Sequence, residues 1–586
     1  MNSPLGGGVD LEKDAWRIAD ADAAVQPASP LLARMISSLL NSVKANNNSM
    51  VSLIANRVDK FIIVTAIVFL TSLSLETHAD GQRPNVVVFL VDDLGWQDLG
   101  CYGSTFYETP NIDRFAECSV RFTQAYAACH VCSPTRASIL TGKYPARLHL
   151  TDWLPGRKDY PFQKLKNAEI HQHLPLDEIT IAEALKQHGY RTAHIGKWHL
   201  GEDPHGPLQQ GFDIQIPSWN KGWPKAGYDA PFQLEGLEDK PGQYLTDRLT
   251  DVAESFMETS KKEPFFLYLS HFAVHDPIEG REDLVRKYKE KLATMRSPGD
   301  SAFILEGNPD DEKLLSKDQL TDRLHRPAWS GNKVLPDRTV KIKQHQDNVP
   351  FAAMVESVDE SLGRVLAKLE SLGINDNTIV ILFSDNGGMS AANFGSPNRI
   401  VSKDQLDKAY STSNLPLRGA KGWLYEGGIR EPLIIHWPNH GGQGKLCDVP
   451  VISTDLYPTI LEMLDLPLQP KQHADGVSLT PLLKGAVRLD RDAMYWHFPH
   501  YSNHGMQSPG GAIRAGDYKL LEYFENNTVQ LFNLKDDIGE QNDLSALHPD
   551  KVNELRSMLN AWRDRVSARM MPENPKYQPT KVPSAR

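Results

Sequence analysis

A continuous apolar, β-branched run at residues 85–91 restricts the fold more than any other feature of the chain. Its lack of alternation predicts a strand buried on both faces, as in the parallel sheets of α/β proteins. The run ends in Asp92-Asp93, and open α/β sheets bind ligands at the carboxyl ends of their strands. Adjacent carboxylates at such a place are costly unless a positive partner neutralises them. The alternative interpretation is a solvated turn with a helix cap.

A second buried strand is predicted at residues 378–383, and it ends in Ser384-Asp385-Asn386. Carboxylate and amide oxygens are the ligands that Ca²⁺ and Mg²⁺ prefer. Asp92 and Asp93 from one strand and Asp385 and Asn386 from the other therefore predict one site for a hard divalent cation.

The segment Cys132-Ser133-Pro134-Thr135-Arg136 has the features of a helix start. Ser133 is expected to be the N-cap, Pro134 suits the first turn, and Gly142 is expected to end the helix in a left-handed cap. A helix N-terminus favours a bound anion, and residues four apart lie near each other, so Arg136 is expected beside Cys132. The alternatives for Cys132 are a buried core cysteine or half of a disulfide.

A strand-like run at residues 190–195 leads into Gly-Lys-Trp-His-Leu-Gly at residues 196–201. Lys197 and His199 are two apart, so on an extended backbone they point the same way. A cation beside an imidazole suits an anionic centre that needs proton transfer. Taken alone, the pair is better interpreted as two surface residues.

These motifs, in this order, resemble those of the type I sulfatases of the alkaline phosphatase superfamily: C-x-P-x-R followed by T-G, then G-K-W-H-L-G, then S-D-N-G. The resemblance covers residues 85–519. It implies an α/β fold with a large, mixed, mostly parallel sheet flanked by helices and a smaller C-terminal subdomain of antiparallel sheet plus helix. It also implies that a maturation enzyme converts Cys132 to Cα-formylglycine.

The resemblance extends to the site residues. It implies that Asp92, Asp93, Asp385, Asn386 and the group derived from Cys132 hold one Ca²⁺. His275, which follows a strand predicted at residues 264–270, matches the histidine at the sulfate or leaving-group oxygen, although His271 competes for that role. By position, Lys421 matches the lysine that contacts sulfate and the ester oxygen.

The implied mechanism is hydrolysis of a sulfate ester by the formylglycine hydrate. Arg136 lowers the cost of the attacking oxyanion, and Lys197, His275 and Lys421 neutralise the sulfuryl and leaving oxygens. His199 takes a proton from the hydrate, and either His275 or Lys421 protonates the leaving group. The alternatives are a phosphonate or phosphate ester hydrolase of the same superfamily and an inactive sulfatase-like binding protein.

The N-terminus has the order of a signal peptide. Arg57 and Lys60 precede an apolar run at residues 61–75 and the small-residue site Thr77-His78-Ala79. The run is short for a membrane span. Residues 1–79 are therefore predicted to be a leader and signal peptide, with the signal at about 50–79 and Met50 as a hypothetical start. The prediction is a secreted or periplasmic protein with no stable membrane span after cleavage, and the alternative is an uncleaved anchor.

The remaining chain is divided into a catalytic domain at residues 80–485 and a C-terminal α+β subdomain at residues 486–586. In the latter we predict antiparallel strands at 512–524 and 529–534 and a helix at 549–570. Residues 279–347 are charged and are expected to leave the core. Conversion of Cys132 leaves four of the five cysteines, with three pairings open.

The net charge of −11 gives no indication of nucleic-acid binding. An aromatic and histidine-rich loop at residues 496–504 suits recognition of a sugar, although packing between subdomains explains it equally well. With the predicted export, this loop favours a sulfated glycan as the substrate.

Overall fold

The computed structural model describes residues 83–296, 299–311, 313–325, 339–393, 401, 403–442, 444–505 and 507–579. The leader and signal peptide predicted in residues 1–79 lie outside this part of the chain. The described residues from 83 onward belong to one compact unit. The predicted boundary between residues 485 and 486 remains a prediction.

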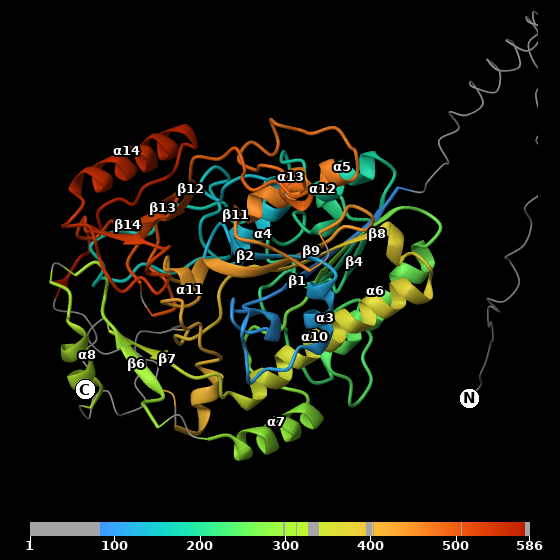
Figure 1. The fold of residues 1–586 in the computed structure, drawn as a ribbon, viewed down its shortest axis with the longest axis horizontal. Helices are drawn as coiled ribbons and strands as arrows, with labels where there is room; N and C mark the ends of the chain where they lie inside the picture. The colour runs from blue at the N-terminus through green and yellow to red at the C-terminus, as the bar shows by residue number, and fades with distance from the viewer. Residues whose placement is uncertain are drawn as a thin grey trace, which may run out of the picture. The chain divides into compact units, whose positions relative to one another are not determined.

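The described residues contain a mixed sheet of nine strands (Figure 1). All neighbouring strands pair in parallel except β9, which runs antiparallel to β2 and β8. In sheet order the strands are β10 (Lys445–Cys447), β2 (Val120–Tyr126), β9 (Arg430–His436), β8 (Thr378–Ser384), β1 (Asn85–Val91), β5 (Phe265–Ser270), β3 (Arg191–Gly196) and β4 (Ile214–Ile216), and β11 (Val451–Ile452) also pairs with β2. This confirms the predicted large, mixed, mostly parallel sheet.

Every residue of β1 is buried, because helices cover both faces of this sheet. Val87 and Phe89 pack on one side, in the core of α3 (Pro110–Glu117), α6 (Leu245–Ser260) and α10 (Val349–Ser371). Val86 and Val88 pack on the other side. The helices there are α4 (Cys132–Thr141), α5 (Ile181–Gln187), α12 (Leu456–Met463) and α13 (Thr480–Leu483).

The carboxyl ends of β1, β8, β5 and β3 meet at one edge of the sheet. In the pairing register Val91 lies beside Ser384, and Gly196 lies beside Ser270. A side chain at position 196 is excluded, because a Cβ atom there would lie 1.9 Å from the carbonyl oxygen of Ser270. The residues that follow these four strands are therefore brought together, which the sequence patterns predicted for those after β1 and β8.

The C-terminal part contains a four-stranded antiparallel sheet and a helix, in agreement with the prediction. Its elements are β12 (Met494–Phe498), β13 (Gly510–Ala515), β14 (Tyr518–Tyr523), β15 (Val529–Asn533) and α14 (Pro549–Arg565). Residues 512–524 form two strands rather than one, because the chain turns at Gly516, which has a φ of 59°. The first part of the predicted loop at 496–504 belongs to β12.

The described residues between 279 and 347 leave the main sheet, as expected. They contain α7 (Glu282–Thr294), β6 (Phe303–Glu306), α8 (Lys317–Leu324) and β7 (Val340–Lys343), with β6 and β7 paired antiparallel. The short helix α11 (Glu426–Ile429) precedes β9, and single 3-10 turns lie at Gly100–Tyr102, Pro207–Gln210, Asn375–Asn377, Lys403–Lys408 and Ser453–Asp455.

All five cysteines lie in the described part of the chain, and none of them forms a disulfide. Among the described residues, none of the helices is both long and apolar enough to cross a membrane.

Candidate active site

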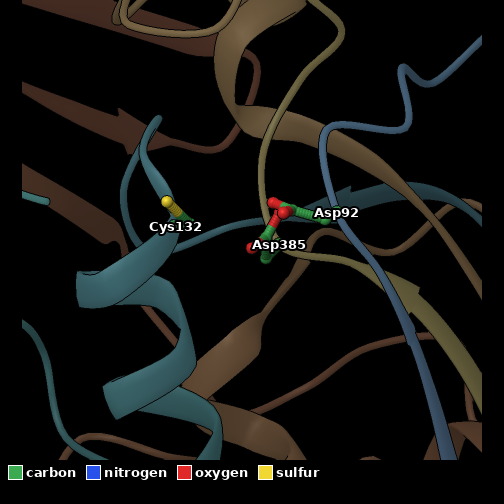
Figure 2. A group of neighbouring side chains, drawn as sticks. All are labelled: Asp92, Cys132 and Asp385. Atoms are coloured by element: carbon green, nitrogen blue, oxygen red, sulfur yellow. The ribbon is translucent and has the colours of Figure 1, made fainter. Parts of the chain in front are cut away.

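Cys132 is the first residue of α4, at the sheet edge where β1 and β8 end (Figure 2). The expected N-cap was wrong by two residues, because Val131 is the cap and Ser133 lies inside the helix. The hydroxyl of Ser133 instead accepts a hydrogen bond of 3.1 Å from the backbone N–H of Leu154. Gly142 ends the helix with a φ of 68°, as predicted. Since all ten residues of α4 are buried, the position of Cys132 is tightly fixed.

The imidazole of His199 contacts Cys132. Its Nδ1 lies 3.3 Å from Sγ of Cys132, and its Nε2 lies 2.8 Å from the carbonyl oxygen of Leu154. A carbonyl only accepts, so Nε2 carries the proton and Nδ1 has a free lone pair toward position 132. Burial and the charge of Lys197 lower the pKa of His199 well below its usual value. His199 is thus neutral, with an unprotonated nitrogen toward Cys132.

We expected Lys197 and His199 to reach the site from an extended backbone. This expectation was wrong. The chain leaves β3 at Gly196, and His199 has a left-handed φ of 58°. Lys197 therefore points to the carboxylates after β1, while His199 points to α4.

Three ligand-type atoms, one each from Asp92, Cys132 and Asp385, all lie within 4.8 Å of one another (Figure 2). Arg136 contacts this group through Asp385: its Nε donates a hydrogen bond of 2.7 Å to the Asp385 carboxylate. One Nη of Arg136 also donates to the hydroxyl of Ser270 at 2.6 Å. The arginine lies one helical turn after Cys132, as its spacing predicted.

Each lysine of the site lies on one of the paired carboxylates. Nζ of Lys197 is 2.5 Å from Oδ2 of Asp92, and Nζ of Lys421 is 2.6 Å from Oδ1 of Asp93. All four side chains are at most 3% exposed. Burial opposes the charge of Lys421, but Asp93 outweighs it and raises the pKa of the lysine. Lys421 therefore remains cationic beside its carboxylate.

The four predicted side chains with oxygen ligands fit a hard divalent cation. Among the described residues, Oδ1 of Asp92 and Oδ1 of Asn386 are buried without a hydrogen-bond partner. Burial and the Asp385 carboxylate raise the pKa of Asp92 well above its usual value, so its ionised form needs more positive charge than Lys197 supplies. Side-chain oxygens are the donors that Ca²⁺ and Mg²⁺ take. A cation bound here would also free both lysines to hold an anion.

His275 lies beside this group, and His271 does not. Nε2 of His275 is 3.8 Å from Oδ2 of Asp93, while Nδ1 lies 2.9 Å from Asp276. Burial opposes protonation of His275, but these carboxylates raise its pKa to about 9. His271 is packed in the core, where its Nε2 lies 2.9 Å from the hydroxyl of Ser361.

A cavity of about 350 Å³ opens above the site, and Cys132, His199, His275 and Lys421 all line it. The further lining residues, which were not predicted as site residues, include Trp153, Trp223, Asn503 and His504. The histidine-rich loop at 496–504 was a signal for the last two. No pattern in the sequence marked the two tryptophans, which lie in irregular segments.

The family model for Sulfatase matches residues 84–466. The chain belongs to the sulfatase family. A second model, for the C-terminal region of N-sulphoglucosamine sulphohydrolase, matches residues 420–565. The sulfatase identified here is therefore a sulfuric ester hydrolase, and the predictions of its family, its fold class and its enzyme class are confirmed.

Similar proteins have related descriptions. A protein named Sulfatase from Formosa agariphila is 30% identical, and the match covers 83% of this chain and 90% of the relative. The N-acetylgalactosamine-6-sulfatase of Mus musculus is also 30% identical, over 84% of this chain and 83% of the relative. The crystal structure of Ps i-CgsB in complex with k-i-k-neocarrahexaose superimposes with a TM-score of 0.62 at 26% identity, covering 85% of this chain and 94% of that chain.

Proposed function

We propose that this sulfatase hydrolyses sulfate esters of carbohydrates with Cα-formylglycine, formed from Cys132, and one bound Ca²⁺. The observation that carries the proposal is the position of Cys132 at the start of α4, between the free Nδ1 of His199 and the carboxylates of Asp92 and Asp385. When present, the formylglycine hydrate would supply the attacking oxygen and the cation would lower the cost of its negative charge.

The described side chains have the charges that this reaction needs. His199 would take a proton at position 132 through Nδ1, since its Nε2 is occupied by Leu154. Arg136 would hold Asp385 in place and add positive charge one helical turn after the nucleophile. With a divalent cation on the carboxylates, Lys197 and Lys421 would turn from them to the sulfuryl oxygens, where positioned charge stabilises the transition state.

Two groups remain candidates for protonating the leaving alcohol. His275 and Lys421 both line the cavity, and each is held beside Asp93. Either would donate a proton to the oxygen that leaves from sulfur.

A carbohydrate leaving group is supported by the cavity walls and by the relatives. Two tryptophans offer apolar surface to the C–H face of a sugar ring. The similar mouse protein is named for an amino-sugar sulfate, and the similar Ps i-CgsB structure holds k-i-k-neocarrahexaose. We also propose that a formylglycine-generating enzyme acts on this chain and that the signal peptide predicted at about 50–79 directs its export.

The proposal is tested by producing the protein together with a formylglycine-generating enzyme and comparing hydrolysis of matched sulfate, phosphate and phosphonate esters. We expect the sulfate ester to be the best substrate by kcat/KM and a chelator to abolish its turnover. A higher kcat/KM for the phosphate or phosphonate ester would favour the alternative hydrolase of the same superfamily. Binding of a sulfate ester without turnover would favour the inactive binding protein.

A further inference from the structure

His504 is part of the C-terminal region but lies at the cavity above Cys132. Its side chain lines the same wall as Asn503. It is not among the groups that bind sulfate or the cation in the proposed mechanism. It shares the cavity with His275 and Lys421, the two candidates for protonating the leaving alcohol in the proposed mechanism.

Several contacts hold His504 in place. Its backbone N–H donates to the hydroxyl of Ser502 at 3.0 Å, and the carbonyl of Ser502 accepts from Arg157 at 2.9 Å. A Cβ atom at Gly422, the residue after Lys421, would lie 2.5 Å from Cβ of His504. The absence of a side chain at Gly422 thus lets His504 approach the catalytic lysine closely.

The ring of His504 has unused hydrogen-bonding capacity. The residue is 4% exposed, and neither ring nitrogen has a hydrogen-bond partner among the described residues. Buried polar side chains almost always have a partner, and an unmade hydrogen bond costs about 1–3 kcal/mol. Every other histidine in residues 496–504 has at least one: Nε2 of His497 contacts a carbonyl of Arg569, and Nε2 of His500 contacts the hydroxyl of Thr151.

The surroundings of His504 keep its ring neutral. Burial and the nearby ammonium group of Lys421 lower its pKa to about 3. A neutral imidazole has one N–H donor and one lone-pair acceptor. A hydroxyl group, which also donates once and accepts, matches this ring, whereas the neutral ring itself offers no positive charge to a sulfate or a carboxylate.

We propose that His504 binds a free hydroxyl group of the sugar next to the sulfate ester and so selects carbohydrate sulfates in which that hydroxyl is unmodified. The inference rests on the proposed function and adds the feature of the substrate that is recognised. Trp153 and Trp223, which line the same cavity, would hold the ring of that sugar. A second sulfate at the recognised hydroxyl is expected to be rejected.

The test compares two kinds of substrate on the matured enzyme and on its H504A variant. One is 4-nitrophenyl sulfate, which has no sugar hydroxyl. The others are monosulfated N-acetylgalactosamine and N-acetylglucosamine. For the better of these two sugars, the test adds an analogue that lacks the hydroxyl group next to the sulfate ester. We expect H504A to lower kcat/KM for the sugar sulfate at least about tenfold, as for a lost buried hydrogen bond, and to leave 4-nitrophenyl sulfate within about threefold. Wild type should prefer the hydroxylated sugar over its deoxy analogue, and H504A should not.

His500→Asn is the matched control, because His500 belongs to the same loop but does not line the cavity. This variant should change kcat/KM by the same factor for the sugar sulfate and for 4-nitrophenyl sulfate. Equal losses in H504A, no loss in H504A, or a wild type that hydrolyses 4-nitrophenyl sulfate but no sugar sulfate would each overturn the role of His504. Failure of the proposed function is distinguishable, since the wild type would then release sulfate from neither kind of substrate.

Discussion

Nζ of Lys197 lies 2.5 Å from Oδ2 of Asp92, and both side chains are completely buried. The lysine and the carboxylate, which we propose as a catalytic group and a metal ligand, thus neutralise each other. The same relationship joins Lys421 and Asp93. It follows that the cation and the substrate anion should bind cooperatively, because the cation takes the carboxylates from the lysines that the anion needs.

Removal of Ca²⁺ should therefore weaken anion binding. After chelation with EGTA, inorganic sulfate should bind at least about tenfold more weakly by calorimetry, because both lysines return to their carboxylates. Addition of Ca²⁺ should restore sulfate binding and raise the Tm. Equal sulfate affinity with and without Ca²⁺ would contradict this coupling.

Asp385→Asn should lower the affinity for Ca²⁺ at least about tenfold, since even residues that only support metal ligands cost 10–100-fold when changed. Calorimetric titration of Ca²⁺ measures this directly and does not depend on activity. Asp475→Asn is the control, because Asp475 is paired with Arg147 and lies outside the cavity. A Ca²⁺ affinity of Asp385→Asn equal to that of this control would show that Asp385 is not a ligand.

Lys197→Ala should lower kcat by on the order of 10²–10³, the usual loss when one positioned charge at a developing oxyanion is removed. Lys143→Ala provides the comparison, since Lys143 pairs with Glu178 and does not line the cavity, and it should keep near-normal turnover. The assigned role of Lys197 is wrong if the two variants have similar kcat values on 4-nitrophenyl sulfate.

His199→Asn should slow turnover by about 10²–10⁴, the range of a general base, and should not prevent conversion of Cys132 to the aldehyde. Turnover is measured with 4-nitrophenyl sulfate, and conversion by the mass of the peptide. A loss of conversion that accounts for the whole loss of activity would place His199 in maturation rather than in catalysis.

Asp98 gives a pH prediction for stability away from the cation site. Burial raises its pKa to about 7, although Thr412, Gly95 and Gln346 donate to it. Since the folded protein then binds this proton more tightly than the unfolded chain, the free energy of unfolding falls as the pH rises from about 4 to about 7.

Asp98→Asn removes this titration. The Tm of the variant minus that of wild type should therefore be more positive at about pH 8 than at about pH 5. Thermal unfolding at both values measures the difference, and other titrating groups cancel because they are common to the two proteins. An unchanged difference would show that Asp98 is ionised across the whole range.

The main sheet and the cluster of charges at its edge follow from short-range patterns in the sequence. The uninterrupted run before Asp92 and the similar run before Asp385 were enough to predict two buried strands, because only a strand covered on both faces tolerates such composition. The meeting of Asp92, Arg136 and Asp385 then follows from the common direction of parallel strands.

Other features depend on contacts between distant segments. The left-handed backbone at His199 and the Leu154 carbonyl that fixes its tautomer have no local pattern. The cap at Val131 was missed because Ser133, a good N-cap by type, is used instead to bind the N–H of Leu154. His504 was inside a loop that the sequence marked, but only its missing partners distinguish it from the packed histidines beside it.

The most direct test is the mass of the peptide that contains Cys132, taken from active protein made together with a formylglycine-generating enzyme. We predict that the aldehyde replaces the thiol and that the converted fraction of different preparations is proportional to their rate of sulfate release. Active protein in which Cys132 remains an unmodified thiol would contradict the account.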